Sequence, residues 1–417
     1  MNKYYISFAV VTAMAISANA VEVNPFGHLG AFYHQGFGGL GIQNKDGKEV
    51  QRAYANISAR AGLDIGLSSS LSIGIGAWGG YPAYSTGVDG AVGDIAFPKN
   101  GDVSDAYLRY DGGRLSFALG RFDMGEFYLG KDGKNYTGVD WIYGNVQGAA
   151  LNIDGGAVSL WAYWRNSQLG AGQAYNRMGY ELSSFDTYQH QKANMGELFS
   201  GGIDIDFGAL KVSPFVSYLT DENTKVAQRD ILNAGGKALL DVGSGALRSF
   251  TTLRAVWGID NIAGSASSAS GLTLWVDEEV RISDIFKIGL GYINQGKNNN
   301  LLNYGDRARF YGYRGGMSGA GVGNFLGYGD TYYVFGGVET RRAAIDLLYA
   351  GGDYEEISAI GSVKIWQGND KMHLSLGAGY VGTGKVDANS TLGNFIGNVT
   401  NGDKWQHSAL AFAKFGF

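Results

Sequence analysis

Apolar and polar residues alternate with a period of two in segment after segment of this 417-residue chain. Between positions 52 and 65, small or apolar residues occupy every second position, and the positions between them carry polar residues such as Arg52 and Arg60. Similar alternation appears in segments 71–78, 158–165, 272–282 and 372–380. Because successive side chains of a strand point to opposite faces, these segments are predicted to be β-strands with one apolar and one polar face.

The last eight residues, Leu410–Phe417 ("LAFAKFGF"), follow the same pattern up to the chain end. Ala411, Ala413, Phe415 and Phe417 fall on one uncharged face, and Lys414 falls on the other. The last residues of a chain are usually polar and poorly ordered. An end that stops inside an alternating strand indicates that this strand pairs with another part of the chain.

The first twenty residues read as a secretory signal. Lys3 is followed by a mostly apolar run from Ile6 to Ile16, which is too short for a membrane-spanning helix, and the stretch closes with Ala18-Asn19-Ala20. We expect a cleaved signal peptide over residues 1–20 and one mature domain over residues 21–417.

Composition narrows the class of protein. The chain has no cysteine, a net charge of −5, 68 glycines, 26 tyrosines and only 4 prolines. The absence of cysteine excludes a disulfide scaffold and a thiolate metal site. The absence of basic excess argues against nucleic acid as a partner. With no linker-like segment, the composition favours one large β structure.

The connections between the predicted strands are alternately short and long. Tight turns are expected at 68–70, 111–113, 154–156, 207–209 and 283–284, and long loops near 82–102, 125–139, 168–196, 221–236, 297–328 and 383–403. This plan is typical of an outer-membrane barrel, which has short periplasmic turns and long extracellular loops. The predicted fold is therefore an all-β transmembrane antiparallel β-barrel in the outer membrane of a Gram-negative bacterium.

An even number of strands is required when both chain ends lie on the periplasmic side. Seventeen segments are evident at first, and the direction of their neighbours calls for one more, which 236–245 ("GKALLDVGSG") supplies. We predict 18 strands, with 16 as the fallback. Pro214 should cause a bulge or local break, and 308–316 ("ARFYGYRGG") is a further possible strand.

In a closed barrel the last strand pairs with the first, which places Phe415 and Phe417 in the periplasmic aromatic girdle. A terminal phenylalanine preceded by hydrophobic residues at alternate positions resembles the signal that the barrel assembly machinery reads in bacterial outer-membrane proteins. The stretches "NPFGHLGAFYH", "ALGRFDMGEF" and "FAKFGF" also make the chain similar to Hof-type outer-membrane proteins of Helicobacter and its relatives. More distantly it resembles the 18-stranded specific porins of the OprD type. These resemblances imply a pore former.

A barrel of 16–18 strands leaves an aqueous channel. The predicted inward faces carry both bases and acids, among them Arg254. The stretch 123–138 ("DMGEFYLGKDGKNYTG"), which includes most of the long loop near 125–139, carries Asp123 and Glu126. We hypothesise a constriction in which these two acids face Arg52, Arg60 and Arg109, so that the opposed charges select solutes. The alternative is that these are ordinary wall residues paired with their neighbours.

An enzyme is not supported. His373-Leu374-Ser375 has the spacing of an outer-membrane phospholipase pair, but the alternation directs both polar side chains into the lumen, away from lipid. The five histidines show no metal-ligand spacing, so no metal and no cofactor are expected.

The predicted function is a porin for passive diffusion of small hydrophilic solutes or ions. The alternative is a surface adhesin, because the loops at 168–196 and 297–328 are rich in Tyr, Asn, Gly and Gln. Expected partners are outer-membrane lipid, lipopolysaccharide, the assembly machinery and the solutes. The sequence leaves open the solute, the sign of ion selectivity, and whether the protein is a monomer or a homotrimer.

Overall fold

The structure is a computed structural model that describes residues 22–37, 41–43, 49–51, 53–85, 100–124, 127, 142–171, 197–221, 229–262, 269–296, 329–353, 355–368, 372–384 and 405–417. Within these ranges, no helix is long and apolar enough to cross a bilayer.

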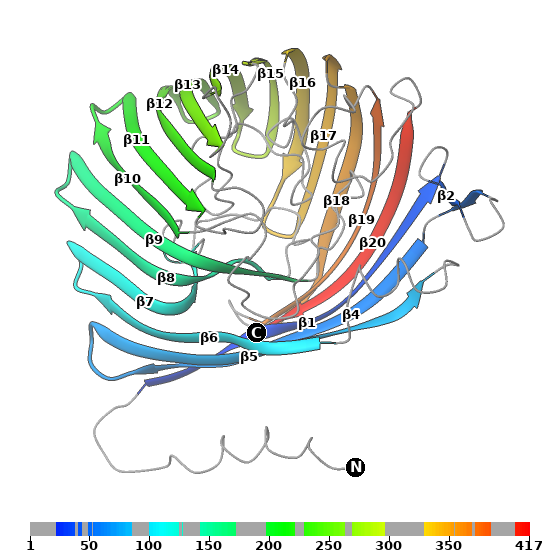
Figure 1. Cartoon of the computed structure of the whole chain (residues 1–417). Helices are drawn as coiled ribbons and strands as arrows, with labels where there is room; N and C mark the ends of the chain where they lie inside the picture. The colour runs from blue at the N-terminus through cyan, green and yellow to red at the C-terminus, as the bar shows by residue number, and fades with distance from the viewer. Residues whose placement is uncertain are drawn as a thin grey trace, which may run out of the picture.

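Eighteen strands pair in one sheet that closes on itself, and each is antiparallel to its neighbours (Figure 1). In ring order they are β1 (Glu22–Phe37), β4 (Ala53–Gly66), β5 (Leu71–Ser85), β6 (Asn100–Asp111), β7 (Leu115–Asp123), β8 (Ile142–Asp154), β9 (Val158–Ala171), β10 (Glu197–Asp206), β11 (Leu210–Asp221), β12 (Arg229–Ser244), β13 (Leu247–Ile262), β14 (Ala269–Ile282), β15 (Phe286–Gln295), β16 (Gly329–Glu339), β17 (Ala343–Gly352), β18 (Glu355–Gln367), β19 (His373–Gly384) and β20 (Gln406–Gly416). A separate two-stranded sheet joins β2 (Gly41–Gln43) and β3 (Glu49–Gln51).

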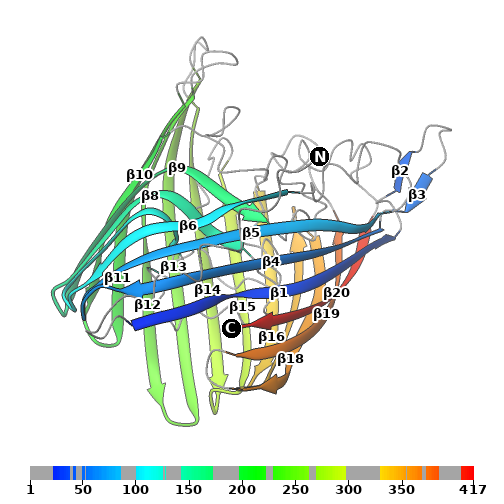
Figure 2. The ribbon, with the colours of Figure 1, turned by 90° about the horizontal axis from the view of Figure 1, so that it is seen from below.

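The ring closes where β20 lies against β1, as both ribbon views show (Figures 1 and 2). Their pairing runs from His28 opposite Gly416 to Phe37 opposite His407. Beyond it, the backbone N–H of Gly27 donates to the carbonyl of Phe417 at 2.9 Å, and the N–H of Phe417 donates back at 3.1 Å. The final residue is therefore fixed by the seam, as the alternation up to the chain end predicts.

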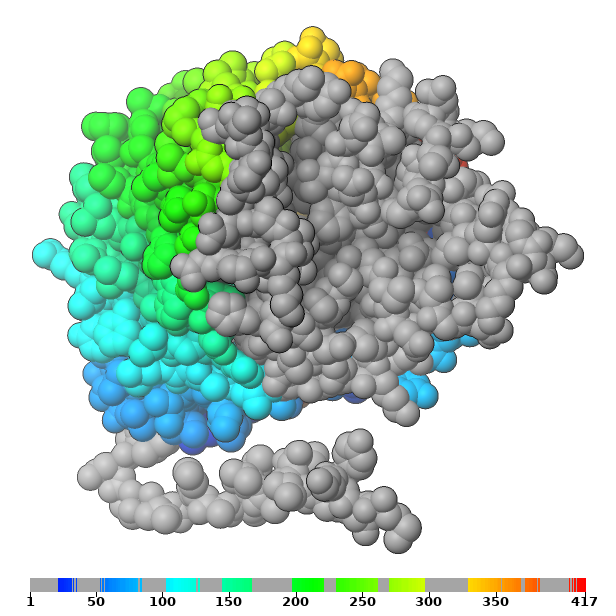
Figure 3. All heavy atoms as spheres, viewed as in Figure 1, coloured from blue at the N-terminus to red at the C-terminus, as the bar shows by residue number. Residues whose placement is uncertain are grey.

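The two faces of the wall differ in chemistry. Along β14, Leu272, Leu274 and Val276 are exposed on the outside, whereas Thr273 and Asp277 are buried on the inside. The outer face elsewhere is also apolar and exposed, for example at Ile288, Leu290 and Val334. The strands coloured blue to green form a continuous wall along the left side of Figure 3.

The predicted 18-stranded antiparallel barrel is confirmed. The extra strand expected at 236–245 is the second half of β12. Pro214 interrupts the pairing of β11 with β10, since no partners are recorded between Gly202–Phe215 and Ile205–Val212, and the register is unchanged across this gap. The effect of Pro214 is a local break and not a bulge. Segment 308–316 lies outside the described residues.

The expected long loop at 221–236 is wrong, because β12 already begins at Arg229, opposite Asp221 of β11. Gly235 and Gly236 suggested a loop end, but both lie inside the strand. A Cβ atom on Gly235 would lie 2.4 Å from the carbonyl oxygen of Ala255 on β13. This glycine therefore permits close approach between strands and does not mark a turn.

The close packing of Gly27, at the end of the seam, gives a prediction about stability. Gly27 has a φ of +153°, and a Cβ there would lie 2.1 Å from the carbonyl oxygen of Arg60. Gly27→Ala should therefore lower the free energy of unfolding by about 1–3 kcal/mol through overpacking. The measurement is the urea midpoint of the refolded protein in lipid vesicles, followed by tryptophan fluorescence.

Gly66→Ala on β4 is the matched control. Its Cβ would make only ordinary contacts with Glu22 of β1, at 3.6 Å. An equal shift of the urea midpoint in both variants would contradict the assigned packing of Gly27 against β4.

Candidate functional site

Charged side chains line the inner face of the barrel, and many of them form ion pairs with a residue on the same or a nearby strand. Three pairs are buried and join neighbouring or near-neighbouring strands: Arg60–Asp105, Arg254–Asp277 and Lys287–Asp346. Three more lie closer to the turns and are partly exposed: Lys211–Asp206, Arg248–Asp241 and Arg281–Glu279. Paired charges keep a wall polar while they cancel most of its net field.

Arg60 of β4 is held by Asp105 of β6. Its Nε donates to one carboxylate oxygen at 3.0 Å, and an Nη donates to the other. The hydroxyl of Ser104 and the amide of Asn145 also donate to this carboxylate, at 2.7 and 3.2 Å. Asp105 is fully buried, and its carboxylate is held by this bidentate contact and by these donors.

The chain beyond β7 begins by packing against the same region of the inner wall. Asp123, the last residue of β7, has a carboxylate oxygen 3.9 Å from an Nη of Arg60. Met124 is fully buried, and the ring of Phe127 lies 6.0 Å from that of Phe122. The guanidinium of Arg109 lies over Phe127, also at 6.0 Å.

Phe26 of β1 completes this packed cluster. The Arg60 guanidinium lies 5.0 Å from the centre of its ring, which is a cation–π arrangement. The void left between the side chains of the cluster has a volume of only about 10 Å³. Arg60 and Asp123 are therefore in contact and do not face each other across an opening.

A second cluster lies on the opposite wall, because β13 is nine strands from β4 in either direction around the ring of 18. Arg254 of β13 forms an ion pair with Asp277 of β14 at 2.5 Å and lies 4.9 Å from the ring centre of Trp275. The Tyr333 hydroxyl donates to Asp277 at 3.2 Å and accepts from the Trp275 indole N–H at 2.6 Å.

Closer to the short turns that join β12 to β13 and β14 to β15, Phe250 lies between two guanidinium groups. Arg248 is 4.8 Å and Arg281 is 5.4 Å from the centre of its ring. Arg248 pairs with Asp241 at 2.6 Å, and Arg281 pairs with Glu279 at 2.5 Å. The basic row on this part of the wall is thus matched by a row of carboxylates.

The structure brings together three of the predicted constriction residues: Arg60, Arg109 and Asp123 contribute to one cluster. Arg254 lies on the far wall, and Arg52 and Glu126 are outside the described residues. Sequence reasoning missed that Asp105 is the main partner of Arg60. The alternation placed Asp105 on the inward face but could not show which base it meets.

At the chain end, the rings of Phe415 and Phe417 lie 6.0 Å apart, and Phe415 is 6.1 Å from Trp366 of β18. This arrangement agrees with an outward aromatic group at the short-turn end. Recognition of these residues by the assembly machinery stays a prediction.

The His373–Ser375 pair lies on β19. Ser375 is buried on the inner face of β19, on the same side as His373, as the alternation predicts. In the described part of the chain, no group of three or more His, Cys, Asp or Glu residues could hold a metal ion.

The buried pair on β13 and β14 generates a prediction. Asp277→Ala should destabilise the barrel by about 3–5 kcal/mol, because Arg254 would stay buried without its counter-charge. The double variant Arg254→Met/Asp277→Leu should lose much less, since it removes both charges. The measurement is urea unfolding in lipid vesicles.

Lys211→Met is the control for a general loss of charge. Its partner is Asp206 at 3.2 Å, and both side chains are about half exposed. Such pairs contribute about 0–1 kcal/mol. Equal losses for Asp277→Ala and Lys211→Met would show that the buried pair has no special role.

No family model and no curated protein matches the sequence. Solved structures do match. OpdK of Pseudomonas aeruginosa, solved with vanillate, has a TM-score of 0.58 at 11% identity, and the alignment covers 94% of this chain and 99% of that one. OccAB1 of Acinetobacter baumannii has a TM-score of 0.58 at 10% identity, with coverage of 95% and 97%. OccK11 (OpdR) of Pseudomonas aeruginosa has a TM-score of 0.57 at 11% identity, with coverage of 95% and 96%. At such low identity the likeness shows a shared fold, which is the fold that the resemblance to OprD-type porins implies.

Proposed function

We propose that this protein is an outer-membrane channel through which small hydrophilic solutes diffuse passively. The observation that carries the proposal is the closed 18-stranded ring whose outer face is apolar and whose inner face carries ion pairs. A closed barrel satisfies its backbone groups internally, as a bilayer requires. Rings of 16–18 strands are wide enough for an aqueous channel.

The likeness to solved structures supports the same function. One of them, OpdK, is described as an outer membrane protein, and it has also been solved with vanillate. We propose small solutes for this chain as well, without transferring that ligand. Residues 172–196 and 297–328, on which the adhesin alternative mainly depends, lie outside the described residues, and no observation on the described ones favours it.

We also propose finer features that follow from the sequence. Residues 1–20 would be a cleaved signal peptide, and Phe415 and Phe417 would be read during barrel assembly. The constriction would involve Arg52, Arg60, Arg109, Asp123, Glu126 and Arg254, supported by the position of Asp123 beside Arg60 on the inner wall. The Hof-type family, contact with lipopolysaccharide and a homotrimer belong to the same set of proposals.

The test of channel function is single-channel recording of the refolded mature protein in a planar bilayer with a salt gradient. Stable, discrete openings are expected. A folded, heat-modifiable barrel that never conducts would contradict the proposal.

The same recordings test the constriction. Replacing Arg52, Arg60 and Arg109 by glutamate should shift the reversal potential toward cation selectivity, because it exchanges three proposed positive charges of the constriction for negative ones. The triple variant could fail to fold, because Arg60→Glu removes the partner of the buried Asp105. Arg109→Glu alone leaves that pair in place and is measured as the second variant. Lys211→Glu near the short-turn end should change selectivity little. Unchanged selectivity in a conducting triple variant would refute the constriction and leave the channel intact.

A further inference from the structure

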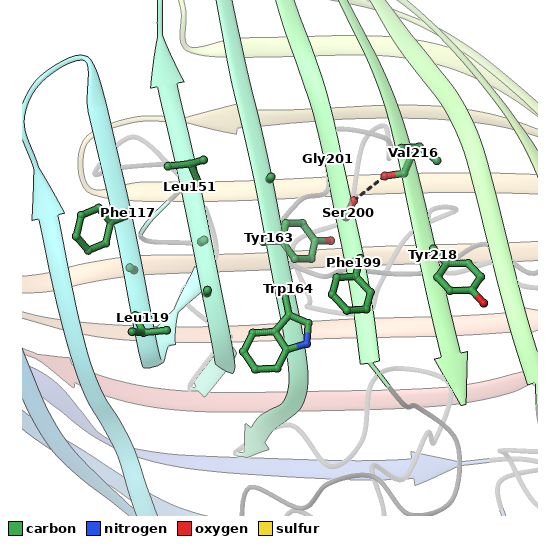
Figure 4. A pocket seen from close by; sticks show the side chains of 14 residues that line it. Phe117, Leu119, Leu151, Tyr163, Trp164, Phe199, Ser200, Gly201, Val216 and Tyr218 are labelled. Carbon is green, nitrogen blue, oxygen red and sulfur yellow. Dashed lines mark hydrogen bonds between the residues drawn. The ribbon is translucent and has the colours of Figure 1, made fainter. Parts of the chain in front are cut away.

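The outer face of β7 to β11 is hollowed by a groove of about 620 Å³ (Figure 4). Its floor is formed where small residues replace bulky ones on neighbouring strands: Ala149 of β8, Ala162 of β9 and Gly201 of β10. These three share the outward face with exposed apolar residues such as Leu151 and Val216. The groove therefore opens to the outside of the barrel.

The strand register builds the rim of this groove. One cross-strand row runs from Leu119 to Ala149 and Trp164, and then to Phe199 and Tyr218. Figure 4 shows Trp164, Phe199 and Tyr218 on successive strands along one side of the groove. In this row Ala149 is the small residue, so the rim is open at Ala149, between Leu119 and Trp164.

Polar side chains lie next to this opening in the rim at Ala149. Arg121 and Gln147 are the next outward residues after Leu119 and Ala149, and they are cross-strand partners. The Arg121 Nε donates to the Gln147 side-chain oxygen at 3.0 Å, and an Nη donates to the Val103 carbonyl at 3.0 Å. Gln147 donates in turn to Asn166 at 3.3 Å.

This network fixes the guanidinium of Arg121 on an outer wall that is otherwise apolar around the groove. Arg121 lies near the end of β7 that leads into a long connection, which is the proposed extracellular side. On a lipid-facing wall a charged side chain is least costly where it reaches the polar interface. Its planar donors suit a phosphate group.

We propose that this groove seats one acyl lipid that bears an exposed phosphate monoester, with an acyl chain along the Ala149–Ala162–Gly201 floor and the phosphate at Arg121. The proposal rests on the barrel lying in a membrane, as the proposed function requires. It does not depend on conductance.

A lipid fits this groove better than a second copy of the chain. A neighbouring barrel is convex and meets the wall along a narrow strip, whereas the floor is set back beside the rings of Trp164 and Phe199. A flexible acyl chain can follow such a floor. A second copy would also have to present an acidic group to Arg121 at the same depth.

Trp164 serves as the reporter, because it lines the groove. The protein is reconstituted in vesicles of unlabelled phosphatidylcholine. A lipid with brominated acyl chains, either phosphatidic acid or phosphatidylcholine, is then added in increasing amounts. The quenching of Trp164 is the difference between wild type and Trp164→Phe. Half-maximal quenching should need about fivefold less brominated phosphatidic acid than brominated phosphatidylcholine, the effect of one basic residue near a membrane surface.

Arg121→Gln and Ala162→Leu should each abolish this preference, the first by removing the charge and the second by filling the floor. Ala359→Leu is the matched control, since Ala359 is an exposed outward alanine on β18, nine strands from β9. It should keep the full preference.

Equal quenching by the two lipids, or a preference that survives Arg121→Gln, would overturn the proposal. So would an unquenched Trp164 together with disulfide cross-linking of Ala162→Cys between two copies, which would assign the groove to a protein interface. Trp257, exposed on the outer face of β13, distinguishes failure of the membrane location itself. If Trp257 is not quenched by either lipid, the proposed function fails and not merely the groove.

Discussion

Each backbone N–H and C=O within the wall needs a partner inside the protein, because the interior of a bilayer offers none. The structure meets this demand by joining β20 to β1, with Phe417 and Gly27 hydrogen-bonded at the end of the seam. This closure gives the backbone of Phe417 its hydrogen-bond partners. Gly27 is packed from both sides, because a Cβ there would lie 2.1 Å from the Arg60 carbonyl oxygen of β4 and 2.9 Å from the Phe417 ring.

Once the ring is closed, the alternation of each strand divides the residues between two environments. The inner face holds charges mostly as pairs, such as Arg60–Asp105 and Arg254–Asp277 on opposite walls. Pairing offsets part of the desolvation penalty that each buried charge carries. The outer face is apolar, and its departures from that rule, such as Arg121 beside the β7–β11 groove, point to contacts of their own.

Periodicity predicted a β-barrel and seventeen of its strands, and the requirement for alternating strand direction supplied the eighteenth, in β12. It could not give the partners across strands. Arg60 and Asp105 are 45 residues apart, and Trp275 and Tyr333 are 58 apart, so their meeting depends on register, which period-two alternation leaves undetermined. Glycine was the other source of error: Gly235 and Gly236 look like turn residues, but in β12 they allow neighbouring strands to approach.

The most direct test of this account is whether one strand is wet on one face and in lipid on the other. The chain has no cysteine, so single cysteines can be placed along β14 and treated with a water-soluble maleimide in intact proteoliposomes. The account predicts fast labelling at Glu279 and Arg281, which face inward, and protection at Val276 and Val280, which face outward. Equal labelling at all four positions, or protection of the inward pair alone, would contradict it.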